Sequence, residues 1–177
     1  MRRFKLMVLG AVGASAIALF AGSPALAAAT TTSTYSFDLV TANTAVSPDG
    51  GTMCGMTMAG DWISVTGSGT FSPAAQTIKA KGSFTHYNSS GTVMCKGTWK
   101  ATGFTSFTDF GTNDQGQDGG VLSMVVTHYC KTMGMTMTGI PMTVTSIVNA
   151  PPGYTEGTTV GDFTQPTGGT VVIEPEQ

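Results

Sequence analysis

The stretch that decides the fold runs from residue 61 to residue 101 and reads DWISVTGSGTFSPAAQTIKAKGSFTHYNSSGTVMCKGTWKA. Apolar residues and glycines alternate with hydroxyl and lysine side chains over 63–72, 78–87 and 92–101. This period of two places alternate side chains on opposite faces, which predicts three half-buried antiparallel strands. Turn-forming residues separate the strands at 73–76 and 88–91.

The turns also predict a register for these strands. With Ser72 opposite Thr77 and Tyr87 opposite Thr92, two rows of inner-face residues line up across the three strands. One row holds only glycine, and a row of glycines favours a bend or a close approach of backbones. The two rows are Gly67, Gly82 and Gly97, and Gly69, Ala80 and Trp99.

Weaker strand patterns surround this region. Alternation predicts a strand near 35–39, a mostly looped segment over 42–60, and continuation of the third strand past a kink at Gly103. A polar loop over 111–120 precedes a strand over 121–130. The segment 133–148 changes its apolar phase near Gly139, which indicates a bulge or an edge. A last short strand is expected near 170–173. The sequence therefore predicts an all-β fold: a single antiparallel meander-type domain over 35–177, either a bent barrel or a sandwich.

The first 27 residues have the pattern of a signal peptide. A basic start at 1–5 precedes a short apolar run, and Ala25-Leu26-Ala27 provides a cleavage site near Ala27. Residues 28–34 are predicted to be a flexible leader. The apolar run is short and no cysteine follows it, which argues against a permanent membrane anchor. We expect an exported protein, periplasmic or extracellular, with both the general secretory and the twin-arginine routes open.

Charge narrows the choice of partners. After residue 27 the chain keeps five lysines and all ten acidic residues, which gives a net charge of −5. Because the sequence shows no cluster of basic residues that could bind phosphates, nucleic acid is not an expected partner.

Three related segments follow one another along the chain: Gly-Ser-Gly-Thr-Phe, Lys-Gly-Ser-Phe-Thr-His and Lys-Gly-Thr-Trp-Lys-Ala-Thr-Gly-Phe. This pattern resembles that of small secreted bacterial β-barrel or β-sandwich proteins of uncharacterised function. The resemblance that the segments carry covers roughly residues 61–173. The resemblance implies a fold type and brings no activity with it.

Sulfur and imidazole groups are concentrated in the predicted mature part, which holds three cysteines, two histidines and nine methionines. In a simple meander, the predicted register brings the histidines and two cysteines to one end of the sheet. Cys95 would lie diagonally beside His86, and His128 and Cys130 would return to the same end. Soft sulfur ligands with imidazole favour Cu(I). The candidate metal ligands are His86, Cys95, His128, Cys130, Met56, Met58, Met133, Met135 and Met137.

A structural explanation of the same residues stays open. Exported proteins commonly pair their cysteines, and methionine fills irregular cores. Cys95–Cys130 is the first expected disulfide because both residues share a face and an end, and Cys54–Cys130 is the second. Connectivity does not follow from sequence alone.

No hydrolase elbow, phosphate-binding loop or metalloprotease motif occurs, so we expect a protein without catalysis. Two further functions stay open. One is a surface or matrix protein that has a stabilising disulfide and no site. The other is a barrel that binds a small apolar ligand. Its pocket would be lined by Phe71, Phe84, Trp99, Leu122, Met124 and Val126, which are also the expected core of a filled domain.

Overall fold

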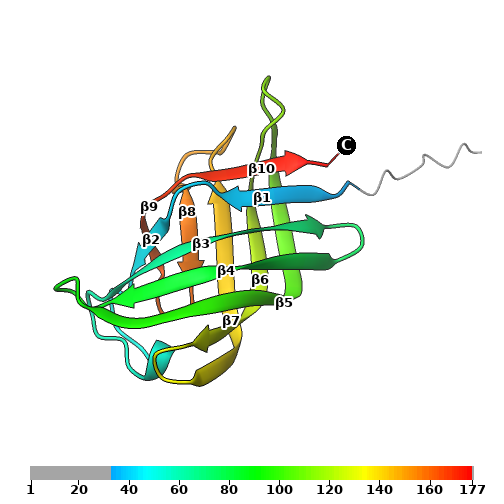
Figure 1. The fold of residues 1–177 in the computed structure, drawn as a ribbon. Helices are drawn as coiled ribbons and strands as arrows, with labels where there is room; N and C mark the ends of the chain where they lie inside the picture. The colour runs from blue at the N-terminus through cyan, green and yellow to red at the C-terminus, as the bar shows by residue number, and fades with distance from the viewer. Residues whose placement is uncertain (1–32, 177) are drawn as a thin grey trace, which may run out of the picture. The chain divides into compact units, whose positions relative to one another are not determined.

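A computed structural model describes residues 33–176; the predicted signal peptide and most of the predicted leader lie outside the described residues. The described part is almost entirely antiparallel β-structure with one short 3-10 turn, η1 (Met53–Gly55), as predicted for an all-β chain (Figure 1). No helix in this part is long and apolar enough to cross a membrane. The strands are β1 (Tyr35–Leu39), β2 (Asn43–Val46), β3 (Trp62–Ser72), β4 (Thr77–Tyr87), β5 (Val93–Thr112), β6 (Asp118–Cys130), β7 (Met135–Ser146), β8 (Gly157–Val160), β9 (Gln165–Gly168) and β10 (Val171–Pro175).

Six of the strands form a closed circuit of pairings. Strands β3, β4, β5 and β6 pair in sequence order, as a meander requires. The first and last strands close the circuit, because β1 pairs with both β3 and β10, and β10 touches β6 through Ile173 and Asp118. Strands β2 and β9 continue from β3, and β7 and β8 continue from β6. The meander is therefore confirmed for β3–β7, while the closure by the terminal strands was not anticipated.

The long strand β5 turns the sheet through a corner. Its first part runs with β3 and β4, and its second part runs with β6 and β7 in a different direction (Figure 1). Three bulges interrupt its pairing with β6, and the first lies between Ala101 and Gly103. A bulge adds a residue to one strand and bends it. The predicted continuation of this strand past a kink at Gly103 is thus confirmed.

The predicted register is right for one hairpin and wrong for the next. Gly67 faces Gly82 and Gly69 faces Ala80, as expected. On β5, however, Phe84 faces Gly97 and Gly82 faces Trp99, a shift of two residues. One residue of this shift arises at the turn, where Tyr87 faces Val93 instead of Thr92. The other arises at an irregularity between His86 and Tyr87, where β5 holds an extra residue. A shift of two conserves the inner and outer faces, so the predicted burial pattern survives the error.

Trp99 consequently packs against a different row from the predicted one. Its ring lies at Gly67 and Gly82, where an added Cβ would collide with it. The indole Nε1 donates a hydrogen bond to the Thr66 carbonyl oxygen at 3.0 Å. The glycines therefore make room for a buried tryptophan whose polar atom is satisfied.

Other boundaries also differ from prediction. The segment 42–60 was expected to be mostly loop, but it contains β2 and η1. The polar loop expected over 111–120 is shorter, because β5 extends to Thr112 and β6 begins at Asp118. Strands β8 and β9 carried no clear alternation and were not anticipated. The expected last strand is present as β10.

The bulge in β7 supports a stability prediction. Gly139 has a φ of +73°, and an added Cβ would meet nothing within 4 Å. Gly139→Ala should therefore cost about 1–2 kcal/mol of unfolding free energy through backbone strain alone. Gly103→Ala is the matched control, because Gly103 has no positive φ and its Cβ would make an ordinary 3.8 Å contact with Val125. Urea unfolding should show the control within about 1 kcal/mol of the parent; equal losses would contradict this explanation.

Candidate functional site: a sulfur cluster at one end of the sheet

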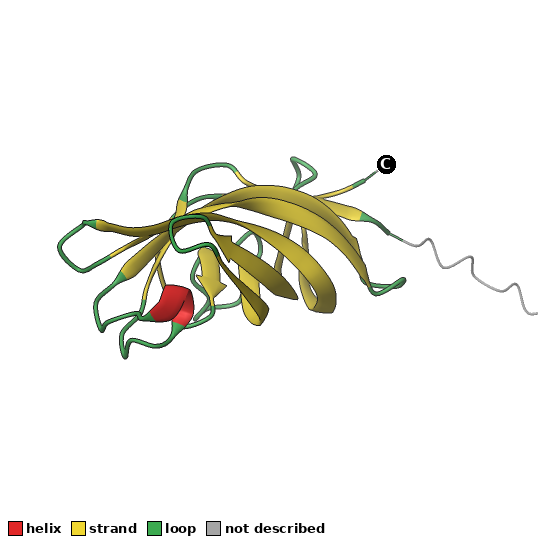
Figure 2. Cartoon of the chain, turned by 60° about the horizontal axis from the view of Figure 1, so that its bottom comes forward, coloured by secondary structure: helices red, strands yellow, loops and turns green. Residues whose placement is uncertain are grey.

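The short η1 turn lies among connecting loops at one end of the strands (Figure 2). The turn after β6 contacts β5, because the Lys131 amide donates to the Lys96 carbonyl oxygen at 2.8 Å. The turn after β4 contacts the segment before β3, because the Ser89 amide donates to the Asp61 carboxylate at 3.2 Å. This end of the molecule gathers all three cysteines.

A disulfide joins Cys95 on β5 to Cys130 on β6, with the two Cα atoms 6.1 Å apart. In the register of these strands Cys130 faces Gly97, so Cys95 is its diagonal neighbour on the inner face. Both residues are fully buried. The first of the two predicted pairings is confirmed, and the alternative Cys54–Cys130 bond is not formed.

Cys54 is a buried free thiol that lies against this disulfide. The three Sγ atoms of Cys54, Cys95 and Cys130, here called the sulfur cluster, all lie within 4.8 Å of one another. Burial raises the pKa of the Cys54 thiol to about 11. At neutral pH the group is therefore a protonated thiol, which is a poor nucleophile toward the neighbouring disulfide.

The η1 turn that carries Cys54 is fixed by polar contacts. The Asp162 carboxylate accepts hydrogen bonds from the amides of Thr52 and Met53 at 2.7 and 2.9 Å. Thr57 donates from its hydroxyl to the Met53 carbonyl oxygen at 2.9 Å. Cys54 itself has a φ of +53°, an uncommon conformation for a residue other than glycine. The thiol is thus held in place by its loop rather than by a regular strand.

The predicted methionines divide into two groups. The Met137 Sδ atom accepts a hydrogen bond from the Cys54 amide at 3.1 Å. The side chains of Met133 and Met135 border Gly55, the next residue along. Met56 and Met58, in contrast, are 66% and 59% exposed. Met133 in the turn before β7 and Met135 and Met137 of β7 therefore lie around η1. Met56 and Met58, which follow η1, are exposed to solvent.

His86 lies close to the cluster and has a structural partner. It faces Cys95 directly across β4 and β5, not diagonally as predicted. Its Nε2 atom lies 3.1 Å from the Asp61 carboxylate, and both side chains are buried. Asp61 also accepts from the Met58 amide at 2.9 Å. The His86–Asp61 pair therefore connects β4 to the segment between η1 and β3.

His128 is buried and unpaired. Neither ring nitrogen has a hydrogen-bond partner among the described residues, and the ring stacks on Phe84 with centroids 4.6 Å apart. Burial lowers the pKa of this imidazole to about 4. Within the described part of the chain, the ring nitrogens of the two histidines are not among the ligand atoms that lie within 4.8 Å of one another; that group consists of the three cysteine sulfurs alone.

The six residues named for an apolar pocket lie together in the interior. Each is 3% exposed or less, and all belong to one cluster of buried side chains with Phe37, Leu39 and Ile173. This position suits the filled core that was the alternative explanation of the same residues.

Sequence reasoning missed two features of this site. Cys54 was considered only as a disulfide candidate, although its loop was expected to lead into the strand at Trp62, at the same end of the sheet. A signal was present, since Cys-Gly-Met-Thr-Met at 54–58 resembles the methionine-rich stretch after Cys130. The Asp61–His86 pair was also missed, although Asp61 immediately precedes β3, the strand that pairs with β4.

Comparisons with known proteins give no guide to this site. No family model, curated protein or solved structure matches the chain.

Proposed function

We propose that this chain is an exported, non-catalytic protein that binds a soft metal ion, Cu(I), at the sulfur cluster once the Cys95–Cys130 disulfide is reduced. The single observation that carries the proposal is the approach of three cysteine sulfurs within 4.8 Å. Thiolate and thioether ligands favour soft metal ions such as Cu(I). Of the two predicted architectures, we assign the bent barrel to the scaffold of the site. The closed circuit of six strands supports this interpretation.

The chemistry of the site involves a redox step and a proton release. A thiol reductant delivers two electrons and two protons to the disulfide, which gives two cysteine thiols, and two reductant thiols become a disulfide. Cu(I) then replaces thiol protons, so the metal affinity should rise with pH. The raised pKa of Cys54 supports the same direction, because its proton leaves only when a metal compensates for burial of the thiolate.

Met137 completes the ligand set in this proposal. Its Sδ atom already lies beside the Cys54 backbone, and a thioether needs no deprotonation. His86 serves as a positioning residue, because its contact with Asp61 holds the segment that carries Cys54. The exposed Met56 and Met58 are not assigned to the reduced site.

The test is an anaerobic Cu(I) titration of the full chain against a chromophoric chelator, with native mass spectrometry as the count of bound ions. We expect the reduced protein to bind one Cu(I) and the oxidised protein to bind at least tenfold more weakly. Cys54→Ser should weaken binding by the reduced protein at least tenfold. A reduced, folded protein that takes up no Cu(I) would overturn the proposal.

A matched pair of variants tests the thioether. Met137→Leu removes the sulfur at nearly constant volume, and Met142→Leu makes the same change at a buried position of β7 that faces Met124 instead of the cluster. Only the first variant should lose Cu(I) affinity. Equal affinities in the two variants would remove Met137 from the site without removing the cysteines.

A further inference from the structure

A groove lies on a different part of the molecule, where β4 and β5 separate. The two strands pair only as far as Lys81 and Lys100, after which β5 bends away and pairs with β6 alone. The groove has a volume of about 540 Å³, which is within the usual range for small-molecule sites. Its walls are formed by Ser68, Gly69, Ile78, Lys79, Ala80, Lys81, Lys100 and Ala101.

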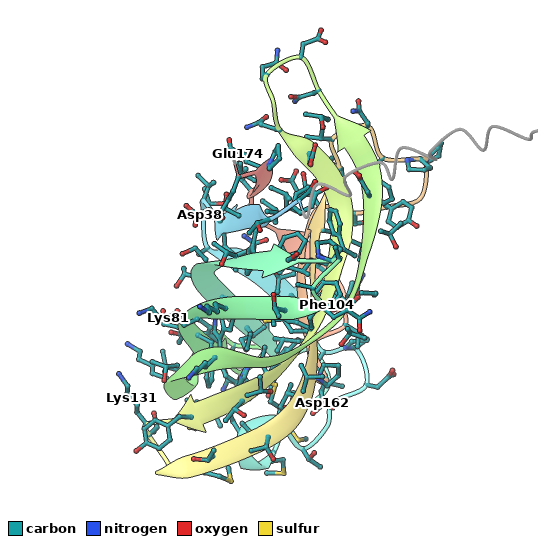
Figure 3. The ribbon with its side chains drawn as sticks, turned by 90° about the vertical axis from the view of Figure 1, so that its right-hand side faces the viewer. Asp38, Lys81, Phe104, Lys131, Asp162 and Glu174 are labelled. Carbon is teal, nitrogen blue, oxygen red and sulfur yellow. A yellow bond between two sulfur atoms is a disulfide. The ribbon has the colours of Figure 1, made fainter. Side chains whose placement is uncertain are left out.

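Three lysines line this groove. Lys79, Lys81 and Lys100 are all exposed, and Lys81 faces Lys100 directly across the strand pair. Like charges directly opposite each other destabilise a sheet. Figure 3 shows Lys81 projecting outward from its strand on the same side as Lys131.

No carboxylate neutralises these lysines. Among the described residues the ion pair between His86 and Asp61 is the only one found, and it lies elsewhere. The acidic residue nearest by register is Asp38, which faces Ser68, and Ser68 in turn faces Lys81. Asp38 is therefore two strand spacings from Lys81, roughly 10 Å along the sheet. The groove keeps a local positive charge although the chain as a whole is acidic.

Apolar residues also line the groove, on the opposite face of the strands from the lysines, where the gap between β4 and β5 reaches them. Ile78 is half-buried, and Ala80 and Ala101 are each 7% exposed. A simple inorganic anion would leave this surface wet, while a neutral apolar molecule would leave the repulsion between the lysines in place. The occupant that satisfies both parts carries an acidic group on a compact apolar body.

We propose that the groove between β4 and β5 binds a small organic acid, with its carboxylate at Lys81 and Lys100 and its apolar body on Ile78, Ala80 and Ala101. This site shares no residue with the sulfur cluster, so its test is independent of the test of the proposed Cu(I) binding.

Calorimetric titration of the oxidised full chain with 2-naphthoate tests the site, with 2-naphthalenemethanol as the uncharged probe of the same ring system. We expect 2-naphthoate to bind, with an affinity that falls as salt is added. The alcohol should bind at least tenfold more weakly. No heat of binding with 2-naphthoate at millimolar concentration would overturn the proposal, as would equal affinity for the two probes.

Paired charge variants locate the binding. Lys81→Gln with Lys100→Gln should weaken 2-naphthoate binding about tenfold, since it removes two surface charge contacts. Lys96→Gln with Lys131→Gln removes the same net charge outside the groove and should leave the affinity within twofold. Equal losses in the two double variants would show general attraction to a lysine-bearing surface and would contradict a site in the groove.

Discussion

Replacing Cys95 and Cys130 together by alanine is expected to lower the free energy of unfolding by about 3–4 kcal/mol. The disulfide joins residues that are 35 positions apart, and such a link restricts the unfolded chain much more than the folded one. The two strands are already held by their ladder of hydrogen bonds, so the fold should persist in the variant. Denaturant unfolding of the oxidised protein and of the variant gives the difference directly.

Reductant distinguishes the effect of the bond from the effect of the lost side chains. The parent protein should lose most of the same stability when it is reduced, whereas the double variant should be insensitive to reductant. Cys54→Ala serves as the control, because it removes a buried thiol without opening the disulfide and should cost about 1–2 kcal/mol. A loss below 1 kcal/mol in the double variant would contradict a stabilising role for the bond.

This prediction also bears on the proposed metal site. The reduced protein is the form that would bind Cu(I), and it is the less stable form. A ligand that binds the folded state restores stability in proportion to the logarithm of its concentration over Kd. Reduced protein should therefore melt at a higher temperature with Cu(I) than without it, and Cys54→Ser should remove most of that increase.

The period-two pattern of the chain was sufficient to predict most of the sheet. It gave the faces of β3, β4 and β5, because alternation alone decides which side chains are buried. The register of β4 against β5 was not predictable in the same way. A turn that is one residue longer than predicted and one extra residue of β5 beside Tyr87 together shift every later pair by two, which leaves the alternation intact. The closure of the strand circuit by β1 and β10 was also not predicted, since pairing between distant segments leaves no local pattern in the sequence.

The candidate site was predicted in its regular part and missed in its irregular part. Cys95 and Cys130 lie on strands, so their shared face and end followed from alternation and a meander. Cys54 lies in a turn with a φ of +53°, fixed by Asp162 from more than a hundred residues away. Such a position depends on tertiary contacts, which no short-range pattern encodes. The histidines were predicted to face inward, and they do, but the Asp61 partner of His86 could not be foreseen.

His128 should make the stability of the oxidised, metal-free protein depend on pH. Burial lowers the pKa of this imidazole to about 4, below its ordinary value of 6.5. Between these values the unfolded chain binds a proton that the folded chain does not, so stability rises with pH. The contribution of His128 is fully present above about pH 6.5 and is lost as the pH falls toward 4. The difference amounts to about 3 kcal/mol.

His128→Leu tests this origin, because it fills the position with an apolar side chain that cannot take up a proton. The variant should show a flatter loss of stability between pH 6.5 and 4 when the two proteins are unfolded in denaturant at several pH values. Near pH 7 it should be at least as stable as the parent, since both ring nitrogens lack partners among the described residues. His86→Gln is the control: it keeps a donor for Asp61 and should retain the part of the slope that His128 causes. Equal slopes in the parent protein and the His128→Leu variant would contradict this origin, because they would show that the unfolded and folded chains bind protons equally at this position. The cause of any acid sensitivity would then lie with the carboxylates.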